Sequence, residues 1–243
     1  MSPRVAIIAA LEREVRPLVR RWRVLRREHD GRQFKFFESQ RAVLVCGGIG
    51  PESARRATEA AITLYNPEAV ISVGFAGALD PALKAGSSFE PHRVVDASDG
   101  SSFETGSGFG TLVSFAVIAG AAQKTKLATA YSAQAVDMEA AAVARGAQTR
   151  GLPFSAFKAI SDEYDFDMPM IKRFISHDGQ FKAMNFVAAL SIRPWLWPRT
   201  IQLDRNSSRA SKVICQWLNQ YNDHPESLEN KPAELHPIKR LKS

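Results

Sequence analysis

The sequence predicts an α/β fold in a single domain, with a central sheet flanked by helices. The first indication is the order of elements from 41 to 73: an apolar strand, a glycine turn, a helix and a second apolar strand. This order is the βαβ unit of α/β proteins. A length of 243 residues suffices for one such domain with a full core and is short for two. Hydrophobic residues make up 45% of the chain and charged residues 23%, which is ordinary for a soluble globular protein.

The first half of the chain supplies most of the predicted strands. The segment from Glu12 to Trp22 is predicted as an amphipathic helix, because Val15, Leu18, Val19 and Trp22 share one face. A proline in its first turn favours a second helix, which Asn66-Pro67 ends. The predicted strands are 5–10, 33–38, 41–46 and 69–73, and the predicted helices are 12–22 and 51–65.

The second half alternates strands with helices and ends in a polar tail. Strands are predicted at 93–96, 112–118 and 154–160, and helices at 123–131, 140–147, 171–175, 181–192 and 207–221. Residues 99–110 are rich in Gly and Ser, which predicts a mobile loop at a rim. Polar residues and three prolines follow from Asn222 onward. We therefore predict a domain over 1–221 and a disordered tail over 222–243.

The chain is strongly basic, but its excess of basic residues is concentrated in a few segments. The net charge is +7 and the sequence pI is about 9.6, with much of the excess in Arg16–Arg27 and His236–Lys242. No motif for nucleic acid accompanies it, so we expect no nucleic-acid partner. Anionic lipid headgroups would suit this charge equally well, which leaves peripheral membrane contact open. Cys46 and Cys215 have no metal or redox spacing, and no run approaches the ~20 apolar residues of a membrane span. We expect a cytoplasmic protein with no metal or cofactor.

Two carboxylates stand out in the stretch from Ala135 to Phe166. Glu139 lies in VDMEAAAVA, where a helix is predicted to begin, and Asp162 ends the apolar run PFSAFKAISD. Open α/β sheets bind ligands beyond the carboxyl ends of their strands, so both acids are expected to face one crevice. The alternative is structural: Glu139 is a solvated helix acid and Asp162 caps a helix.

The glycine turn Gly48-Ile49-Gly50-Pro51-Glu52-Ser53 resembles the phosphate-binding loop of a nicotinamide enzyme. It fits a dinucleotide fingerprint poorly, because Ser53 replaces the third glycine. The next strand also ends in Gly74-Phe75, where an acid should hold the ribose.

Four segments together resemble the nucleoside phosphorylase and nucleosidase superfamily. They are AIIAALEREV, VLVCGGIGPESARRA, PEAVISVGFAGALDPALKAG, and AVDMEAAAVA followed by AISD. The pattern is most similar to methylthioadenosine/S-adenosylhomocysteine nucleosidases and to hopanoid-associated phosphorylases. The resemblance implies a mixed, partly barrel-like sheet, and commonly a homo-oligomer.

The resemblance also implies a role for each site residue. Asp162 would protonate the departing purine, and Ser161 would orient it. Glu139 would bind the 2′ and 3′ hydroxyls of the ribose, Asp137 of the same motif would also bind the substrate, and Glu14 would position the nucleophilic water. Glu14 could instead simply favour the start of its helix. Ala76-Gly77 would let the ligand approach the backbone, and Met138 would lie against the ribose or serve as core.

Three departures from the family bear on the substrate. The segment between Asp96 and Leu112 is shorter than in the soluble nucleosidases, which would leave the 5′ side of the ligand open. Ile118 stands near the family's base-stacking phenylalanine and is expected as core or pocket. The phosphorylases' arginine ahead of the glycine turn is absent, although Arg41, Arg55 or Arg93 could supply its charge.

The resemblance therefore implies an enzyme that releases adenine from a purine nucleoside. The prediction is a hopanoid-associated phosphorylase that acts on an adenosine with a lipid at its 5′ position, adenosylhopane. The segment RPWLWP and the basic surface fit such a substrate. The alternative is a soluble nucleosidase for methylthioadenosine or S-adenosylhomocysteine, and the rival of another class is a catalytically silent binding protein. Inorganic phosphate remains open as a co-substrate.

Overall fold

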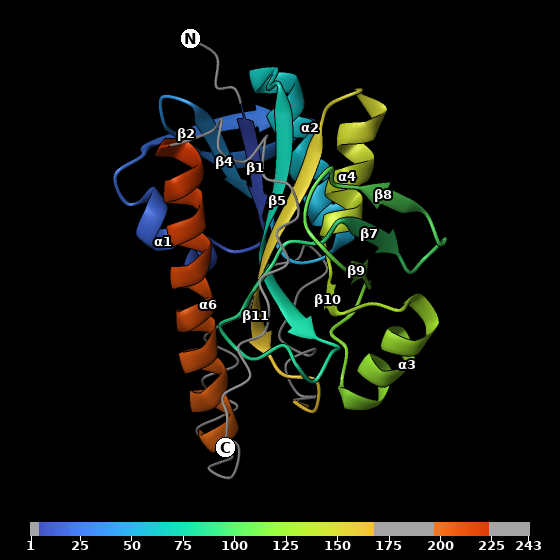
Figure 1. The fold of residues 1–243 in the computed structure, drawn as a ribbon. Coiled ribbons are helices and arrows are strands. Elements are labelled where there is room, and N and C mark those ends of the chain that lie inside the picture. Colours follow the sequence, from blue (N-terminus) through green and yellow to red (C-terminus); the bar gives the residue numbers. More distant parts are fainter. Residues whose placement is uncertain (1–4, 168–196, 224–243) are drawn as a thin grey trace.

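The computed structural model describes residues 5–167 and 197–223 (Figure 1). These residues form a single α/β domain with a mixed sheet of eleven strands between helices, as the sequence predicts. Three predictions lie outside the residues or side chains described. They concern the helices at 171–175 and 181–192, the prolines and tryptophans of RPWLWP, and the tail beyond Asp223. No helix within the described ranges is long and apolar enough to cross a membrane.

The longest strand of the sheet, β5 (Ala69–Ala78), is its centre. Parallel β1 pairs with its first half, antiparallel β10 joins its last residues, and parallel β11 runs along its other edge. The sheet order is β2-β3-β4-β1-β5-β10-β9-β7-β8, and β11 also pairs with β6. The remaining strands are β1 (Val5–Ala9), β2 (Arg23–His29), β3 (Arg32–Glu38), β4 (Ala42–Cys46), β6 (Ser88–Phe89), β7 (Arg93–Asp96), β8 (Ser102–Glu104), β9 (Thr111–Ser114), β10 (Ala135–Asp137) and β11 (Phe154–Asp162).

Helices cover the sheet in two groups. The first group, α2 (Pro51–Tyr65) and α4 (Ala140–Thr149), packs helix on helix, while α1 (Glu12–Val19) packs along α6 (Trp197–Asp223). In Figure 1, α6 runs along one side of the sheet next to β11, and α3 (Ala121–Tyr131) lies near β10 at the lower end. Small side chains allow α2 and α4 to approach: a methyl group at Gly146 would lie 2.8 Å from Cγ2 of Thr58.

Four strands were not predicted: β2, β8 and the short strands β6 and β10. The segment of β2 is an edge strand whose side chains are largely exposed, and its run of arginines carries no alternating apolar signal. Residues 99–110, predicted as a mobile loop, contain β8, which pairs with β7 in a hairpin. Phe103 is buried in the core there, and Arg145 of α4 bonds to both Asp96 and Asp99. The loop prediction missed β8, which one buried aromatic and the bonds of Arg145 support, while 99–101 and 105–110 lie outside any helix or strand.

Several element ends also differ from prediction. Helix α1 ends at Val19, three residues early, because the chain turns there into β2. Strand β9 ends at Ser114, so Phe115–Ile118 forms part of a loop instead. Strand β5 continues through its glycines to Ala78, and α6 begins at Trp197, well before the predicted Ser207.

Candidate active site

The site lies where β5 changes partners on one edge. Strand β1 pairs with β5 as far as Ser72, and β10 joins it only at Gly77. Within the described residues, no strand pairs with that edge between these two points. An interrupted edge in the middle of an α/β sheet is a topological switch point, where such folds bind ligands. Glu14 follows β1 and Glu139 follows β10, so both acids arrive at this gap.

Glu14 is buried beside β5. Its Oε2 accepts the backbone N–H groups of Ala10 and Leu11, at 3.2 and 3.1 Å, so it also caps the start of α1. A methyl group at Gly74 would lie 3.2 Å from the same oxygen, which shows how closely the carboxyl approaches the strand. Burial raises the pKa of Glu14, although those N–H groups and the charges of Lys158 and Arg13 oppose the shift. The two readings of Glu14, as helix cap and as site residue, are therefore compatible.

Glu139 is the N-cap residue of α4 and turns back toward the glycine turn. Its Oε1 accepts the N–H of Gly50 at 2.8 Å, at the start of α2, and Oε2 accepts the N–H of Met138. Burial, and next the Asp137 carboxylate, raise the pKa of Glu139 to about 8, against the opposing effects of Lys158 and Gly50. The interpretation as a solvated helix acid was therefore wrong. A protonated Glu139 can both donate to and accept from a hydroxyl group.

A fully buried ion pair between Lys158 and Asp137 lies next to the two glutamates, and its lysine interacts electrostatically with both. Lys158 of β11 lies 2.8 Å from Oδ2 of Asp137, and its ammonium also donates to Oγ of Ser72 at 2.9 Å. The other oxygen of Asp137 accepts Oγ–H of Ser114 at 2.6 Å, and Oδ2 accepts the N–H of Ala140. Asp137 was predicted to bind substrate, but its side chain has no exposed surface. It acts on the site through Lys158 and Glu139.

The charges at this end of β5 do not balance. Glu14 interacts electrostatically with Lys158 and Arg13, and Glu139 interacts with Asp137, Lys158 and Glu14. Burial is the main reason that the pKa values of Glu14 and Glu139 rise, and the carboxyl groups of Asp137 and Glu14 add to the shift of Glu139. Three carboxyl groups beside two cations make the region favourable for a ligand that develops positive charge.

Asp162 lies at the other end of the same stretch of β5. It pairs with Gly77 after a register shift, so Ser161 forms a bulge between Ile160 and Asp162. The Ser161 hydroxyl lies 2.7 Å from Oδ1 of Asp162 and 3.3 Å from the carbonyl oxygen of Ala76. From Gly74 beside Glu14 to Gly77 beside Asp162 the strand rises about 10 Å, at ~3.3 Å per residue. The two groups of acids therefore share one strand at different heights.

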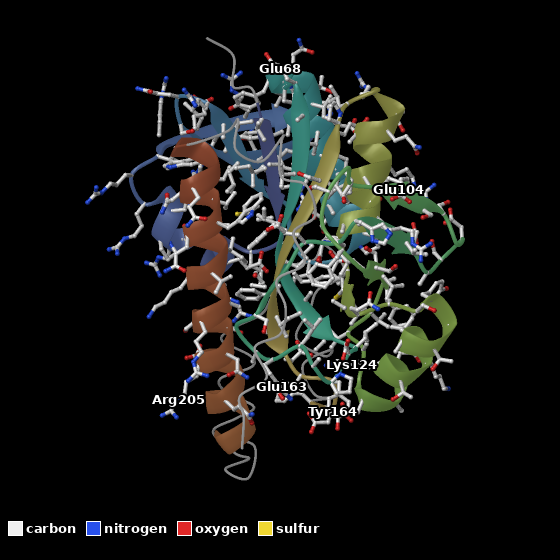
Figure 2. The ribbon with its side chains drawn as sticks, in the orientation of Figure 1. Glu68, Glu104, Lys124, Glu163, Tyr164 and Arg205 are labelled. Carbon is white, nitrogen blue, oxygen red and sulfur yellow. The ribbon has the colours of Figure 1, made fainter. Side chains whose placement is uncertain are left out.

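The partner of Asp162 is Lys124 from α3, a residue that the sequence did not point to. The ammonium forms an ion pair with Oδ2 of Asp162 and donates to the carbonyl oxygen of Glu163 at 2.6 Å. A methyl group at Gly77 would lie 2.8 Å from Oδ2 and 3.2 Å from Cε of Lys124, so the glycine makes room for this pair. Figure 2 places Lys124, Glu163 and Tyr164 together at the lower end of the molecule.

The other predicted residues lie around these two groups. Ala76 is buried, while Met138 and Ile118 are partly exposed, so their contacts with a ligand stay predictions. None of the arginines proposed for phosphate is placed at the gap in β5. Arg55 bonds to Glu52 and Glu59, Arg93 bonds to Thr111, and Arg41 precedes β4, at the end of the strand opposite the glycine turn. Among the described residues, the cations that interact with Glu14 there are Lys158 and Arg13.

Sequence signals for the two lysines differ in strength. Lys158 interrupts the apolar run PFSAF and AIS, and a charge in the middle of a buried strand indicates a paired or functional residue. Lys124 lies in AAQKTKLATAY, a helix with a weak apolar face, where a lysine normally points to solvent. Its role depends on how α3 packs beside Asp162. Within 5–167 and 197–223, no group of three or more His, Cys, Asp or Glu side chains could hold a metal ion.

Comparisons with known proteins agree with this geometry. A sequence model of the phosphorylase superfamily matches residues 4–116 and 97–182. No curated protein matches the chain.

Solved structures match the fold along nearly their whole length. Futalosine hydrolase of Helicobacter pylori has a TM-score of 0.69 at 18% identity, covering 92% of this chain and 99% of that one. The methylthioadenosine/S-adenosylhomocysteine nucleosidase of Colwellia psychrerythraea, solved with adenine, has a TM-score of 0.66 at 20% identity, covering 90% and 93%. S-adenosylhomocysteine nucleosidase of Streptococcus pyogenes, solved with 5-methylthiotubericidin, has a TM-score of 0.66 at 21% identity, covering 95% and 98%.

Proposed function

The chain belongs to the phosphorylase superfamily and is an enzyme that cleaves N-glycosidic bonds, and from this premise we propose that it releases adenine from an adenine nucleoside. The observation that carries the proposal is the pair of acid groups at two heights on β5. Asp162 lies beside Gly77, while Glu14 lies beside Gly74 and interacts electrostatically with Glu139. The proposal assigns the purine to Asp162 and the sugar to the two glutamates.

The chemistry needs both groups. When the bond between C1′ and N9 breaks, its electron pair moves into the purine and positive charge develops on the sugar. A proton from Asp162 to N7 neutralises the departing base. Glu139 holds the ribose hydroxyls, and the carboxylate surplus around it stabilises the cationic sugar. Water then bonds to C1′ and gives its proton to Glu14, whose pKa is raised by burial, so that it accepts the proton more readily than an exposed carboxylate does.

We propose water rather than phosphate as the nucleophile. Around Glu14 and Glu139 the described residues supply three carboxyl groups and two cations, of which Lys158 is paired with Asp137 and Arg13 interacts with Glu14. A phosphate dianion would add two negative charges to a region with a surplus of them. Relatives with the same fold carry hydrolase or nucleosidase in their names, which supports the same reading.

For the substrate we propose an adenosine with an apolar, lipid-like group at its 5′ position. The short segment after Asp96 forms a hairpin that Arg145 ties to α4, so it supplies no helix that could cover the sugar. Val117 and Tyr164 expose apolar surface, and Tyr164 lies two residues after Asp162. The loops that carry them meet where Gly120 approaches Asp167. An apolar substituent that emerges from the site would contact such side chains. We also propose that the enzyme approaches its substrate at a membrane surface.

The test measures free adenine from methylthioadenosine and from a 5′-alkyl adenosine, with and without phosphate. The proposal expects faster release from the 5′-alkyl adenosine and no dependence on phosphate. Faster release from methylthioadenosine would select the soluble nucleosidase, and dependence on phosphate would overturn water as the nucleophile. No adenine from any purine nucleoside would leave a silent binding protein.

A further inference from the structure

Lys124 is a buried cation at the end of the site assigned to the purine. Its side chain is 2% exposed, whereas that of Asp162 is 22% exposed, so a ligand can reach the acid but not the lysine. Burying an ammonium is costly unless it is paired and hydrogen-bonded. The structure satisfies Lys124 with Oδ2 of Asp162 and the carbonyl oxygen of Glu163. The only other buried residue of α3 is Leu127, so helix packing alone does not explain an inward lysine.

The other charged groups near Asp162 are engaged elsewhere. Glu163 turns its carboxylate toward Lys84, at 3.3 Å, and toward the N–H of Ala85. Asp167 approaches Gly120 at the start of α3, one turn before Lys124. Strand β5 contributes the uncharged Gly77, and β11 contributes the Ser161 hydroxyl, which occupies Oδ1. Lys124 is thus the group placed to balance the charge on Oδ2.

We propose that Lys124 is the positioning residue that makes Asp162 an effective proton donor to the leaving base. This inference rests on the proposed function. Asp162 starts the reaction as the protonated acid, having taken a proton from water before the bond breaks. As the bond between C1′ and N9 breaks, its electron pair moves into the purine and the proton passes from Asp162 to N7, which leaves a carboxylate on Asp162. The ion pair between Asp162 and Lys124 that the structure shows is the state after this transfer. The ammonium of Lys124 keeps its own protons and stabilises that carboxylate at the moment it forms. With Ser161 on Oδ1 and Lys124 on Oδ2, the plane of the carboxyl group is also fixed.

The proposal predicts that loss of Lys124 slows cleavage most when the leaving group needs a proton in order to depart. Adenine leaves as a poor anion and needs protonation, whereas 4-nitrophenolate leaves without it. Lys124→Met should therefore lower kcat/KM for an adenine nucleoside about 10- to 100-fold, part of the ~10²–10⁴ that a positioned acid contributes. The same variant should cleave 4-nitrophenyl β-D-riboside within about threefold of wild type. Methionine keeps the apolar stem of the side chain, which limits damage to the fold.

Two matched variants serve as controls. Lys126→Met changes an exposed lysine on the same helix, and Lys84→Met removes the cation that faces Glu163. Both should cleave the adenine nucleoside about as fast as wild type. Lys124→Arg, which keeps the charge, should recover part of the lost rate.

Each outcome has a distinct meaning. If wild type cleaves neither substrate, the proposed function fails before Lys124 is tested. If wild type cleaves both and Lys124→Met loses both rates equally, Lys124 only supports the fold and the inference is overturned. If Lys124→Met keeps the full rate on the adenine nucleoside with unchanged thermal stability, the inference is likewise overturned.

Discussion

Individual carboxyl groups at the candidate site have different surroundings. Asp162 has a cation and a hydroxyl group on its two oxygens, whereas burial raises the pKa of Glu14 and Glu139, and Asp137 adds to the shift of Glu139. The proposed division of labour between purine and sugar rests on this difference.

Glu139 should make the stability of the fold depend on pH. Its pKa is raised from an ordinary 4.5 to about 8, so the folded protein holds this proton longer than the unfolded chain does. The stabilisation is full below about pH 4.5 and is lost as the pH rises to about 8. Glu139→Gln should raise Tm by several degrees more at pH 8.5 than at pH 5.5, since 1 kcal/mol corresponds to about 2–4 °C at this chain length.

Exposed Glu104 supplies the control for this measurement. Glu104→Gln should shift Tm by a similar small amount at both pH values, because Glu104 lies on the solvent side of β8. An equal shift for Glu139→Gln at pH 5.5 and 8.5 would contradict the raised pKa of Glu139.

Among the elements, β5 organises the site because its glycines admit side chains from other elements. Gly74 receives Glu14 and Gly77 receives Asp162 with Lys124. Gly77→Ala should lower kcat/KM about tenfold or more, because displacement of a catalytic group by even 1 Å can cost 10²-fold. The measurement is adenine release together with Tm.

The matched control is Gly146→Ala, which creates a clash of the same size away from the site. A methyl group at Gly146 would lie 2.8 Å from Thr58, as one at Gly77 would from Asp162. Both variants should lose stability, but Gly146→Ala should keep its kcat/KM. Equal losses of activity would mean that Gly77 acts only through the stability of the fold.

Sequence patterns predicted the elements whose signals are local. Helix α2 lies where predicted, at Pro51–Tyr65, because a proline opens it and Asn66, in a left-handed conformation, ends it. Strand β2 escaped prediction because an exposed edge strand needs no apolar alternation. The register shift at Ser161, which aims Asp162 at Gly77, depends on pairing between strands about 85 residues apart and has no local signal.

The candidate acids could be identified from the sequence, but their charge balance could not. Motifs indicate Glu14, Glu139 and Asp162, and the structure brings Glu14 and Asp162 to β5 and Glu139 into electrostatic contact with Glu14. Lys124 could not be chosen, because a lysine on a weakly amphipathic helix is ordinarily exposed. Asp137 was assigned to the ligand, although its bonds to Lys158 and Ser114 keep it inside the protein. Such pairings arise only when distant elements pack.

For the whole molecule, the asymmetry of positive charge suggests where a membrane would bind. Seven arginines lie between Arg13 and Arg27, and those of α1 and β2 are exposed. Arg20→Gln with Arg26→Gln should weaken binding to vesicles that contain anionic lipid about 10- to 30-fold, since each charge near such a surface contributes about 1 kcal/mol. Sedimentation with vesicles measures the bound fraction.

A second double variant separates this face from net charge. Arg55→Gln with Arg56→Gln removes the same charge from α2, where both arginines bond to Glu52. Its binding to vesicles should fall far less than that of the first double variant. Equal losses would show that overall charge, and not the face formed by α1 and β2, governs binding.

The account as a whole depends on Asp162 delivering the proton to adenine, and Asp162→Asn tests this most directly. The variant keeps the size of the side chain and removes the acid, so the rate of adenine release at saturating nucleoside should fall at least about 100-fold. Binding of free adenine, measured by calorimetry on the same preparation, should remain largely unchanged. A near-normal kcat for Asp162→Asn would contradict the assignment of the acid and the mechanism built on it.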